Sequence, residues 1–205
     1  MQTNGDASSP SDETAPFVHP TAVVEDGATL GPDVKIWHFG HVRTGASVGA
    51  GTSTGKSVFI DTKVQVGERV KIQNDVFLPQ GLTVEDEVFL GPYAVFTNDL
   101  HPRAAEDWEL TPTRVGRGAS VSANATVVAG CDLGAYAVVA AGAVVTKPVR
   151  DHQIVAGVPA RHHGWACVCG ATVSRSQEPP SGQVCAKCQR QFPTIEAHED
   201  SGATQ

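Results

Sequence analysis

Aromatic residues and methionine are scarce in this chain of 205 residues. Phe, Trp and Tyr together make up 6% of it and Met occurs once, which is too few large apolar side chains for a helical bundle. Val, Ala and 21 Gly residues dominate instead, a mixture typical of many short strands joined by tight turns. The sequence therefore predicts an all-β fold.

Positive charge and long apolar runs are lacking as well. The formal net charge of −7 gives no overall basic surface, so we expect no nucleic-acid partner. No apolar run approaches the roughly 20 residues that span a bilayer, which argues against membrane insertion. The N-terminal residues also lack the basic start and apolar stretch of a secretory signal. These features predict a cytoplasmic protein.

An apolar residue recurs every six positions through most of the chain. Thirteen such positions run from Val24 to Phe96, and Thr54 is the one that is not a large apolar residue. The series resumes at Val115 and continues to Val145. A small or β-branched residue stands two positions before nearly every member, and a Gly often follows, where we expect it to supply a positive φ at a corner.

A period of six is neither helical nor that of a plain strand, and it indicates short strands separated by turns. Three units make a triangular coil of 18 residues, and stacked coils make a parallel β-helix. A β-sandwich with coincidental spacing would not hold this register so long. Between Phe96 and Val115 the chain carries thirteen additional residues, which predict an external loop at 98–114. Such a loop either serves function or clasps a neighbouring subunit.

Residues 18 positions apart should stack at about 4.8 Å, which places polar residues in ladders along the edges. One edge would carry His38, Lys56 and Asn74, and another would carry Gln80 and Asn98. The β-helix itself does not require these side chains, although Asn ladders are also purely structural features of such folds.

The tandem [LIV]-G-x-x-[AV] units resemble the hexapeptide repeats of left-handed β-helix acyltransferases, over about residues 19 to 165. Four segments further resemble the nucleotide-sugar 3-N-acetyltransferase branch: Ile36-Trp37-His38-Phe39, Lys71-Ile72-Gln73-Asn74, Gly91-Pro92-Tyr93-Ala94-Val95-Phe96-Thr97-Asn98 and Gly157-Val158-Pro159-Ala160-Arg161. The resemblance implies a left-handed β-helix, a homotrimer with active sites between neighbouring subunits, and acetyl transfer from acetyl-CoA to an amine on a nucleotide-linked amino-deoxy sugar. UDP and dTDP remain alternatives for the nucleotide, C3 and C4 for the amine, and a larger acyl group for acetyl.

In that branch the Asn matching Asn98 lies beside the sugar amine, and the leaving thiolate can take the proton. We therefore predict Asn98 as a catalytic residue, and His38 as either the general base or an orienting group. The predicted substrate contacts are Lys56, Gln73, Asn74, Gln80, Tyr93 and Arg103. Coenzyme A is anionic, and the resemblance implies that its nucleotide end lies at the last coils, near Lys147 and Arg161. The small turn at Ala141 would admit the pantetheine arm.

Four of the five cysteines gather near the C-terminus. Cys167 and Cys169, then Cys185 and Cys188, resemble a zinc ribbon with four thiolate ligands, although one residue rather than two separates the first pair. Four sulfur ligands would close the site, so the predicted Zn²⁺ is structural. The predicted organisation is a disordered tail at 1–16, the β-helix at 17–165, a zinc-ribbon-like appendage at 166–193 and a disordered end at 194–205.

Two other functions fit the same fold. A carbonic anhydrase would need three His converging across a subunit interface, and His38, His41 and His101 are the candidates. A non-catalytic scaffold would use its appendage to recruit a partner. The polar edges at Asn74, Gln80 and Asn98 favour the acetyltransferase over both.

Overall fold

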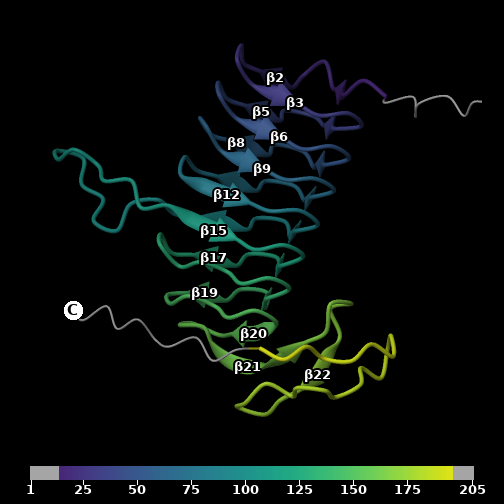
Figure 1. The fold of residues 1–205 in the computed structure, drawn as a ribbon. Helices are drawn as coiled ribbons and strands as arrows, with labels where there is room; N and C mark the ends of the chain where they lie inside the picture. Colours follow the sequence, from purple (N-terminus) through teal and green to yellow (C-terminus); the bar gives the residue numbers. More distant parts are fainter. Residues whose placement is uncertain (1–13, 196–205) are drawn as a thin grey trace, which may run out of the picture.

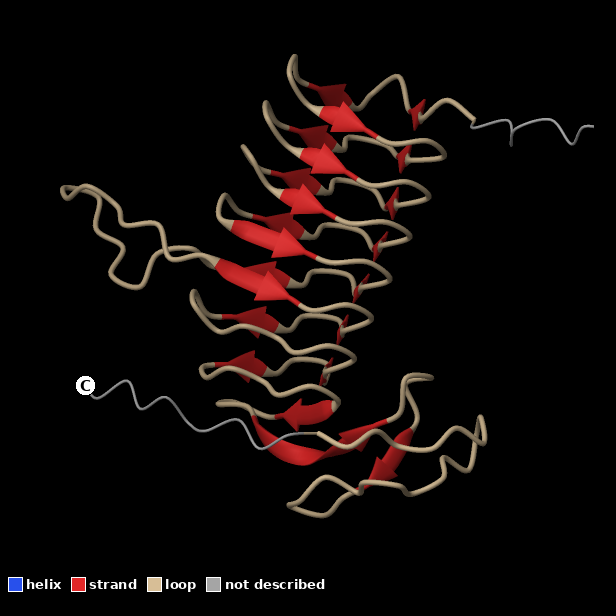
Figure 2. Cartoon of the chain, viewed as in Figure 1, coloured by secondary structure: helices blue, strands red, loops and turns tan. Residues whose placement is uncertain are grey.

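The computed structural model describes residues 14–195, and every regular element in that range is a β-strand (Figures 1 and 2). Residues 1–13 and 196–205, which hold most of the two predicted tails, lie outside the described range. Within residues 14–195 there is no helix with the length and apolar character needed to cross a bilayer.

Three sheets form the sides of the solenoid. Each coil up to β15 contributes one strand to each sheet, and in the two later coils Leu133 and Val149 continue the third side as isolated bridges. The first sheet holds β1 (Phe17–Val18), β4 (Lys35–Ile36), β7 (Ser53–Thr54), β10 (Lys71–Ile72), β13 (Phe89–Leu90), β16 (Ser120–Val121), β18 (Val138–Val139), β20 (Gln153–Ala156), β21 (Arg161–Ala166) and β22 (Thr172–Ser174). The second holds β2 (Val23–Val24), β5 (His41–Val42), β8 (Phe59–Ile60), β11 (Phe77–Leu78), β14 (Val95–Phe96), β17 (Thr126–Val127) and β19 (Val144–Val145). The third holds β3 (Thr29–Leu30), β6 (Ser47–Val48), β9 (Gln65–Val66), β12 (Leu82–Val84) and β15 (Thr113–Val115).

Neighbouring coils pair in parallel with the predicted register of 18. Val24 pairs with Val42, which in turn pairs with Ile60, and the same step recurs in the other two sheets. The residues of the six-residue series fill the interior, where Ile36, Ile60 and most others are almost fully buried. The parallel β-solenoid of stacked coils predicted from the period is thus confirmed.

Thr54, the exception in the series, is buried at 2% exposure because its hydroxyl has partners. Its Oγ1 lies 3.3 Å from the carbonyl oxygen of Lys35, to which it donates, and accepts the N–H of Trp37 at 3.2 Å. The hydroxyl therefore joins two coils without leaving a buried polar group unsatisfied.

The glycines that follow the inward residues serve a different purpose from the one predicted. Gly49 and Gly91 have ordinary φ values, and the positive φ in their turns belongs to other residues, for example Gly51 and Tyr93. A Cβ on Gly49 would lie 2.6 Å from the carbonyl carbon of Gly67 on the next coil. Glycine is needed here because the backbones of successive coils approach too closely for a side chain.

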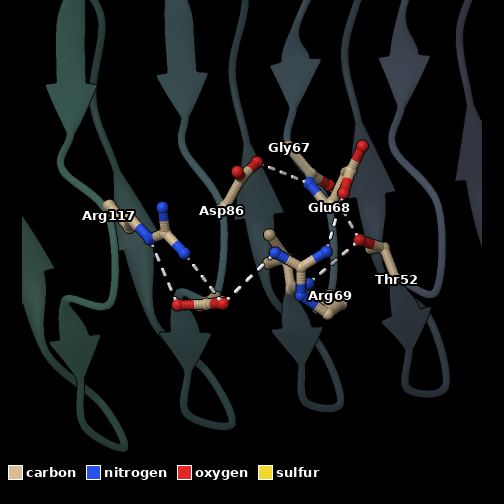
Figure 3. A network of polar contacts seen from close by, with 8 residues as sticks. Thr52, Gly67, Glu68, Arg69, Asp86 and Arg117 are labelled. Atoms are coloured by element: carbon tan, nitrogen blue, oxygen red, sulfur yellow. Dashed lines mark hydrogen bonds and ion pairs between the residues drawn. The ribbon is translucent and has the colours of Figure 1, made fainter.

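The edge between the third and first sheets carries a network of charges (Figure 3). Asp86 Oδ1 accepts the backbone N–H of Glu68 at 2.9 Å, and Arg69 donates to Glu68 and Glu87. Arg117 donates to Glu87 from the next coil at 3.0 Å. Arg117 and then Arg69 hold the pKa of the Glu87 carboxyl below its usual value. The network therefore ties successive coils together along this edge.

The regular coil is interrupted at two places. Leu82 pairs with Thr113, so thirteen additional residues leave the solenoid between β14 and β15 as an external loop at 97–112 (Figure 1). Leu133 pairs with Val149, two residues earlier than a full coil, so the last coil is shortened next to Pro148. Strands β21 and β22 then turn back in antiparallel pairing and lead into the cysteine-bearing appendage (Figure 1).

Candidate functional site

A hollow of about 330 Å³ lies along the edge between the first and second sheets. Three successive turns form it, those that follow β4, β7 and β10. Four of the predicted site residues line it: His38, Lys56, Gln73 and Asn74. The solenoid register thus brings together side chains that stand up to 36 positions apart in the sequence.

Asn74 has a structural contact within this hollow. Its Oδ1 accepts the backbone N–H of Lys56 at 2.9 Å, one coil away. The side-chain carbonyl of Asn74 is therefore already hydrogen-bonded, whereas its Nδ2 can still donate to a bound molecule. Tyr93 follows on the next coil of the same edge. Its backbone N–H donates to the backbone carbonyl of Asn74, and the residue is 55% exposed.

The ring of His38 is stacked at one end of the hollow. It lies 3.6 Å from the ring of His19, centroid to centroid, and nearly parallel to Trp37. Burial, and then the electrostatic effect of the neighbouring His38 ring, lowers the pKa of His19. His19 was not among the predicted site residues, although its distance of 19 positions from His38, about one coil, indicates this proximity.

Asn98 and Gln80 lie on the next edge, between the second and third sheets. Asn98 Nδ2 donates to the Gln80 carbonyl at 3.2 Å, and the Asn98 carbonyl accepts the N–H of Thr111 at 2.9 Å. Asn98 therefore closes the base of the external loop. The predicted catalytic residues Asn98 and His38 consequently stand on different edges of one chain.

A second hollow of about 260 Å³ lies at the last coil and is bounded by β20 and β21. Lys147 and Arg161, both predicted to contact coenzyme A, line it together with Gln153 and His162, which were not predicted. Ala141 is exposed in a turn outside this lining. Arg103 is exposed on the external loop, where it donates to the Pro102 carbonyl, and it lines neither hollow.

The four C-terminal cysteines come together as the sequence predicted. Their sulfur atoms all lie within 4.8 Å of one another, with 3.5 Å between Cys167 and Cys188 and 3.8 Å between Cys169 and Cys185. Tetrahedral zinc with four thiolates requires sulfur separations of about 3.8 Å, so the donor set fits that geometry. Burial raises the pKa of Cys167 to about 12, whereas the backbone N–H of Cys188 lowers the pKa of Cys185 to about 7.

The histidines do not form a comparable cluster within the described part of the chain. His38 stacks on His19, while Nε2 of His41 lies 2.8 Å from a carboxylate oxygen of Glu25. Within residues 14–195, the cysteine quartet is the only group of three or more possible metal ligands. One chain alone therefore offers no three-histidine site in this range.

Comparison with known proteins relates the chain to acetyltransferases, although no family model matches it. It is 47% identical over 57 residues to dTDP-3-amino-3,6-dideoxy-alpha-D-galactopyranose 3-N-acetyltransferase of Aneurinibacillus thermoaerophilus, covering 28% of this chain and 30% of that protein. It is 34% identical over 100 residues to the serine acetyltransferase of Haemophilus influenzae, covering 49% and 31% respectively. The matches thus span about a third of the length of these curated relatives.

A solved structure shares the fold. It is a hexapeptide-repeat containing acetyltransferase of Vibrio cholerae O1 biovar eltor, crystallised with acetyl coenzyme A. The two chains superpose with a TM-score of 0.54 at 24% identity, over 59% of this chain and 70% of the other.

Proposed function

We propose that this chain, which has the fold of the hexapeptide-repeat acetyltransferases, transfers the acetyl group of acetyl-CoA to the amine of a nucleotide-linked amino-deoxy sugar. The observation that carries the proposal is the polar hollow where His38, Lys56 and Asn74 converge from three coils. The similarity to a sugar 3-N-acetyltransferase supports this substrate class.

The chemistry requires a neutral amine whose lone pair is held toward the carbonyl carbon of a thioester. Attack forms the new C–N bond, and collapse of the intermediate breaks the C–S bond and releases coenzyme A as its thiolate. The proton of the substituted amine passes to that thiolate, so the atoms balance without a dedicated base. Asn98 would accept a hydrogen bond from the amine through its Oδ1, because its Nδ2 already donates to Gln80. His38 would orient the substrate or serve as the general base.

Assembly as a homotrimer would bring the predicted residues of the His38 edge close to those of the Asn98 edge. The second sheet lies between the His38 edge and the Asn98 edge, and its outer face is largely apolar. Phe59 and Phe77 stack there at 5.4 Å, and Val23, Phe77 and Val95 are between 37% and 53% exposed. Packing of this face around a threefold axis would place the His38 edge of one subunit beside the Asn98 edge of the next, and would remove the apolar stripe from water.

The second hollow supports a site for the nucleotide end of coenzyme A. Lys147 and Arg161 supply positive charge to its lining in a chain that is acidic overall. The pantetheine arm would then run past Ala141 and the other small residues of that turn toward the amine. Gln80, Gln73, Tyr93 and Arg103 remain proposed contacts of the sugar nucleotide.

We also propose that the cysteine quartet holds a structural Zn²⁺. The close approach of the four sulfur atoms supports it, and four thiolate ligands leave no open position for catalysis. Metal analysis of the purified chain should give one zinc per chain.

A thiol-release assay tests the function. The protein is incubated with acetyl-CoA and a panel of UDP- and dTDP-linked 3-amino and 4-amino sugars, and free coenzyme A is followed with a thiol reagent. Turnover with one of these amines, and none with the corresponding hydroxy sugar, is the expected result. Serine serves as a further acceptor, and turnover with serine alone would overturn the proposed substrate class.

A further inference from the structure

Strand β21 connects the second hollow to the cysteine cluster. Its first residues, Arg161 and His162, line the second hollow, and its last residue, Ala166, directly precedes Cys167. One six-residue strand therefore connects the cysteine cluster to the hollow.

The strand is held on both sides. On one side β20 pairs with it, matching Val155 with His162 and Gln153 with Trp165. On the other side β22, which lies between the two cysteine pairs, matches Ser174 with Trp165. Without the appendage, β21 would become an edge strand held by β20 alone.

His162 connects the hollow directly to the appendage. Its Nδ1 lies 3.1 Å from Nε2 of Gln153, on the hollow's other wall, and its Nε2 lies 2.8 Å from the Ser176 carbonyl, to which it donates. The same carbonyl accepts the indole N–H of Trp165 at 3.0 Å. The position of Ser176, which follows β22 within the appendage, therefore fixes the orientation of the His162 ring.

Packing around Trp165 depends on the appendage in the same way. The indole is fully buried, with the Arg150 guanidinium 4.8 Å above its ring on one side and Phe192 in edge contact on the other. Phe192 follows Cys188 by four residues. Within residues 167–195, only Cys167, Cys185 and Phe192 are buried, so the appendage has almost no apolar core of its own. We therefore expect its order to depend on a metal held by the four sulfurs.

We infer that the cysteine cluster, with its metal bound, holds in place β21, which forms a wall of the second hollow. Metal occupancy then sets the affinity of the chain for coenzyme A. The inference rests on the proposed function for the identity of the ligand. The role of the metal is positional: it fixes β22, Ser176 and Phe192. These hold His162 and Trp165, and thereby the strand that carries Arg161. Loss of the metal leaves the solenoid coils and the first hollow in place.

Two measurements on the full-length protein test this. Hydrogen exchange, followed by mass spectrometry, compares the native protein with protein treated with a zinc chelator. Titration calorimetry measures the Kd of coenzyme A for both. We expect loss of amide protection in β21 and β22, unchanged protection in β4 to β13, and at least a tenfold weaker Kd. Unchanged protection of β21, or an unchanged Kd despite loss of the metal, would overturn the inference.

A matched pair of variants separates the cluster from general effects of losing a cysteine. Cys188→Ser removes one ligand, whereas Cys131→Ala alters a buried cysteine of the solenoid core that lies outside the cluster. Only Cys188→Ser should lose zinc and bind coenzyme A weakly, and equal affinities in the two variants would contradict the inference. Failure of the native, zinc-loaded protein to bind coenzyme A would instead refute the proposed function, and the exchange data would still report whether the cluster holds β21.

Discussion

The backbone N–H of Lys56 donates to Oδ1 of Asn74 at 2.9 Å, across two adjacent coils. This bond shows that a member of the polar edge is part of the scaffold as well as of the hollow. On the edge between the third and first sheets, Asp86 occupies the equivalent position of the repeat and likewise accepts the backbone N–H of Glu68. A polar ladder in this fold therefore serves structure first, and a catalytic role for any member needs a test that separates the two.

Asn74→Ala supplies one such test. Truncation removes the acceptor for the Lys56 N–H, which water can replace because the turn is exposed, so we expect a loss of about 0.5–1.5 kcal/mol in the free energy of unfolding. If Asn74 also contacts the sugar nucleotide, KM for that substrate should rise severalfold while kcat stays within a factor of about two. Denaturant titration and steady-state kinetics measure the two effects. An unchanged KM would leave Asn74 with its structural role only.

Asn98→Ala should affect turnover instead. The variant loses the hydrogen bond to the Gln80 carbonyl and the proposed contact with the amine, and we expect kcat to fall about 10- to 100-fold with little change in oligomeric state. Gln80→Ala is the comparison: it keeps the backbone carbonyl that holds Asn98 and removes a proposed substrate contact, so it should raise KM and leave kcat within a factor of about two. Wild-type kcat/KM in Asn98→Ala would remove this residue from the mechanism.

The six-residue period was sufficient to predict the sheets, the register of 18 and the thirteen-residue excursion. It could not predict features set by contacts between coils. The role of Gly49 depends on how closely Gly67 approaches it, and the shortened coil before Val149 depends on local geometry beside Pro148. The period places His19 about one coil before His38, but the stacking of the two rings follows from their orientation, which the repeat does not set. The proposed meeting of His38 and Asn98 lies beyond any single-chain pattern, since it would require a second copy.

His38→Ala tests whether His38 is the general base or only orients the substrate. If His38 only orients the substrate, activity should fall modestly and the pH profile of kcat/KM should keep its shape. Disappearance of one ionisation from that profile in the variant would identify His38 as the base. The profile of His19→Ala is the matched control, because it removes the stacked ring and leaves His38 in place.

The lowered pKa of His19 makes a separate prediction for stability. Its folded-state pKa lies below the ordinary value of 6.5, so the unfolded chain binds more protons as the pH falls through that value. The contribution of His19 to stability is therefore complete above about pH 6.5 and decreases as the pH falls from there to the folded pKa. Denaturant midpoints measured from pH 8 to pH 5 should decline less steeply in His19→Ala than in the wild type. Parallel curves would contradict the assignment.

Phe77→Asp tests the proposed trimer. The side chain projects from the second sheet, is 40% exposed and stacks on Phe59, so a charge there would be buried between subunits if this sheet forms the interface. Phe89→Asp is a close control, because Phe89 is 38% exposed on the outer face of the first sheet, two strands further along the same solenoid. Light scattering coupled to gel filtration should show a wild-type trimer, a trimer for Phe89→Asp and monomers for Phe77→Asp. Because each proposed active site combines the His38 edge of one subunit with the Asn98 edge of the next, the monomeric variant should also lose turnover while it still binds coenzyme A at the second hollow. A monomeric variant with full activity would show that one chain completes the site by itself.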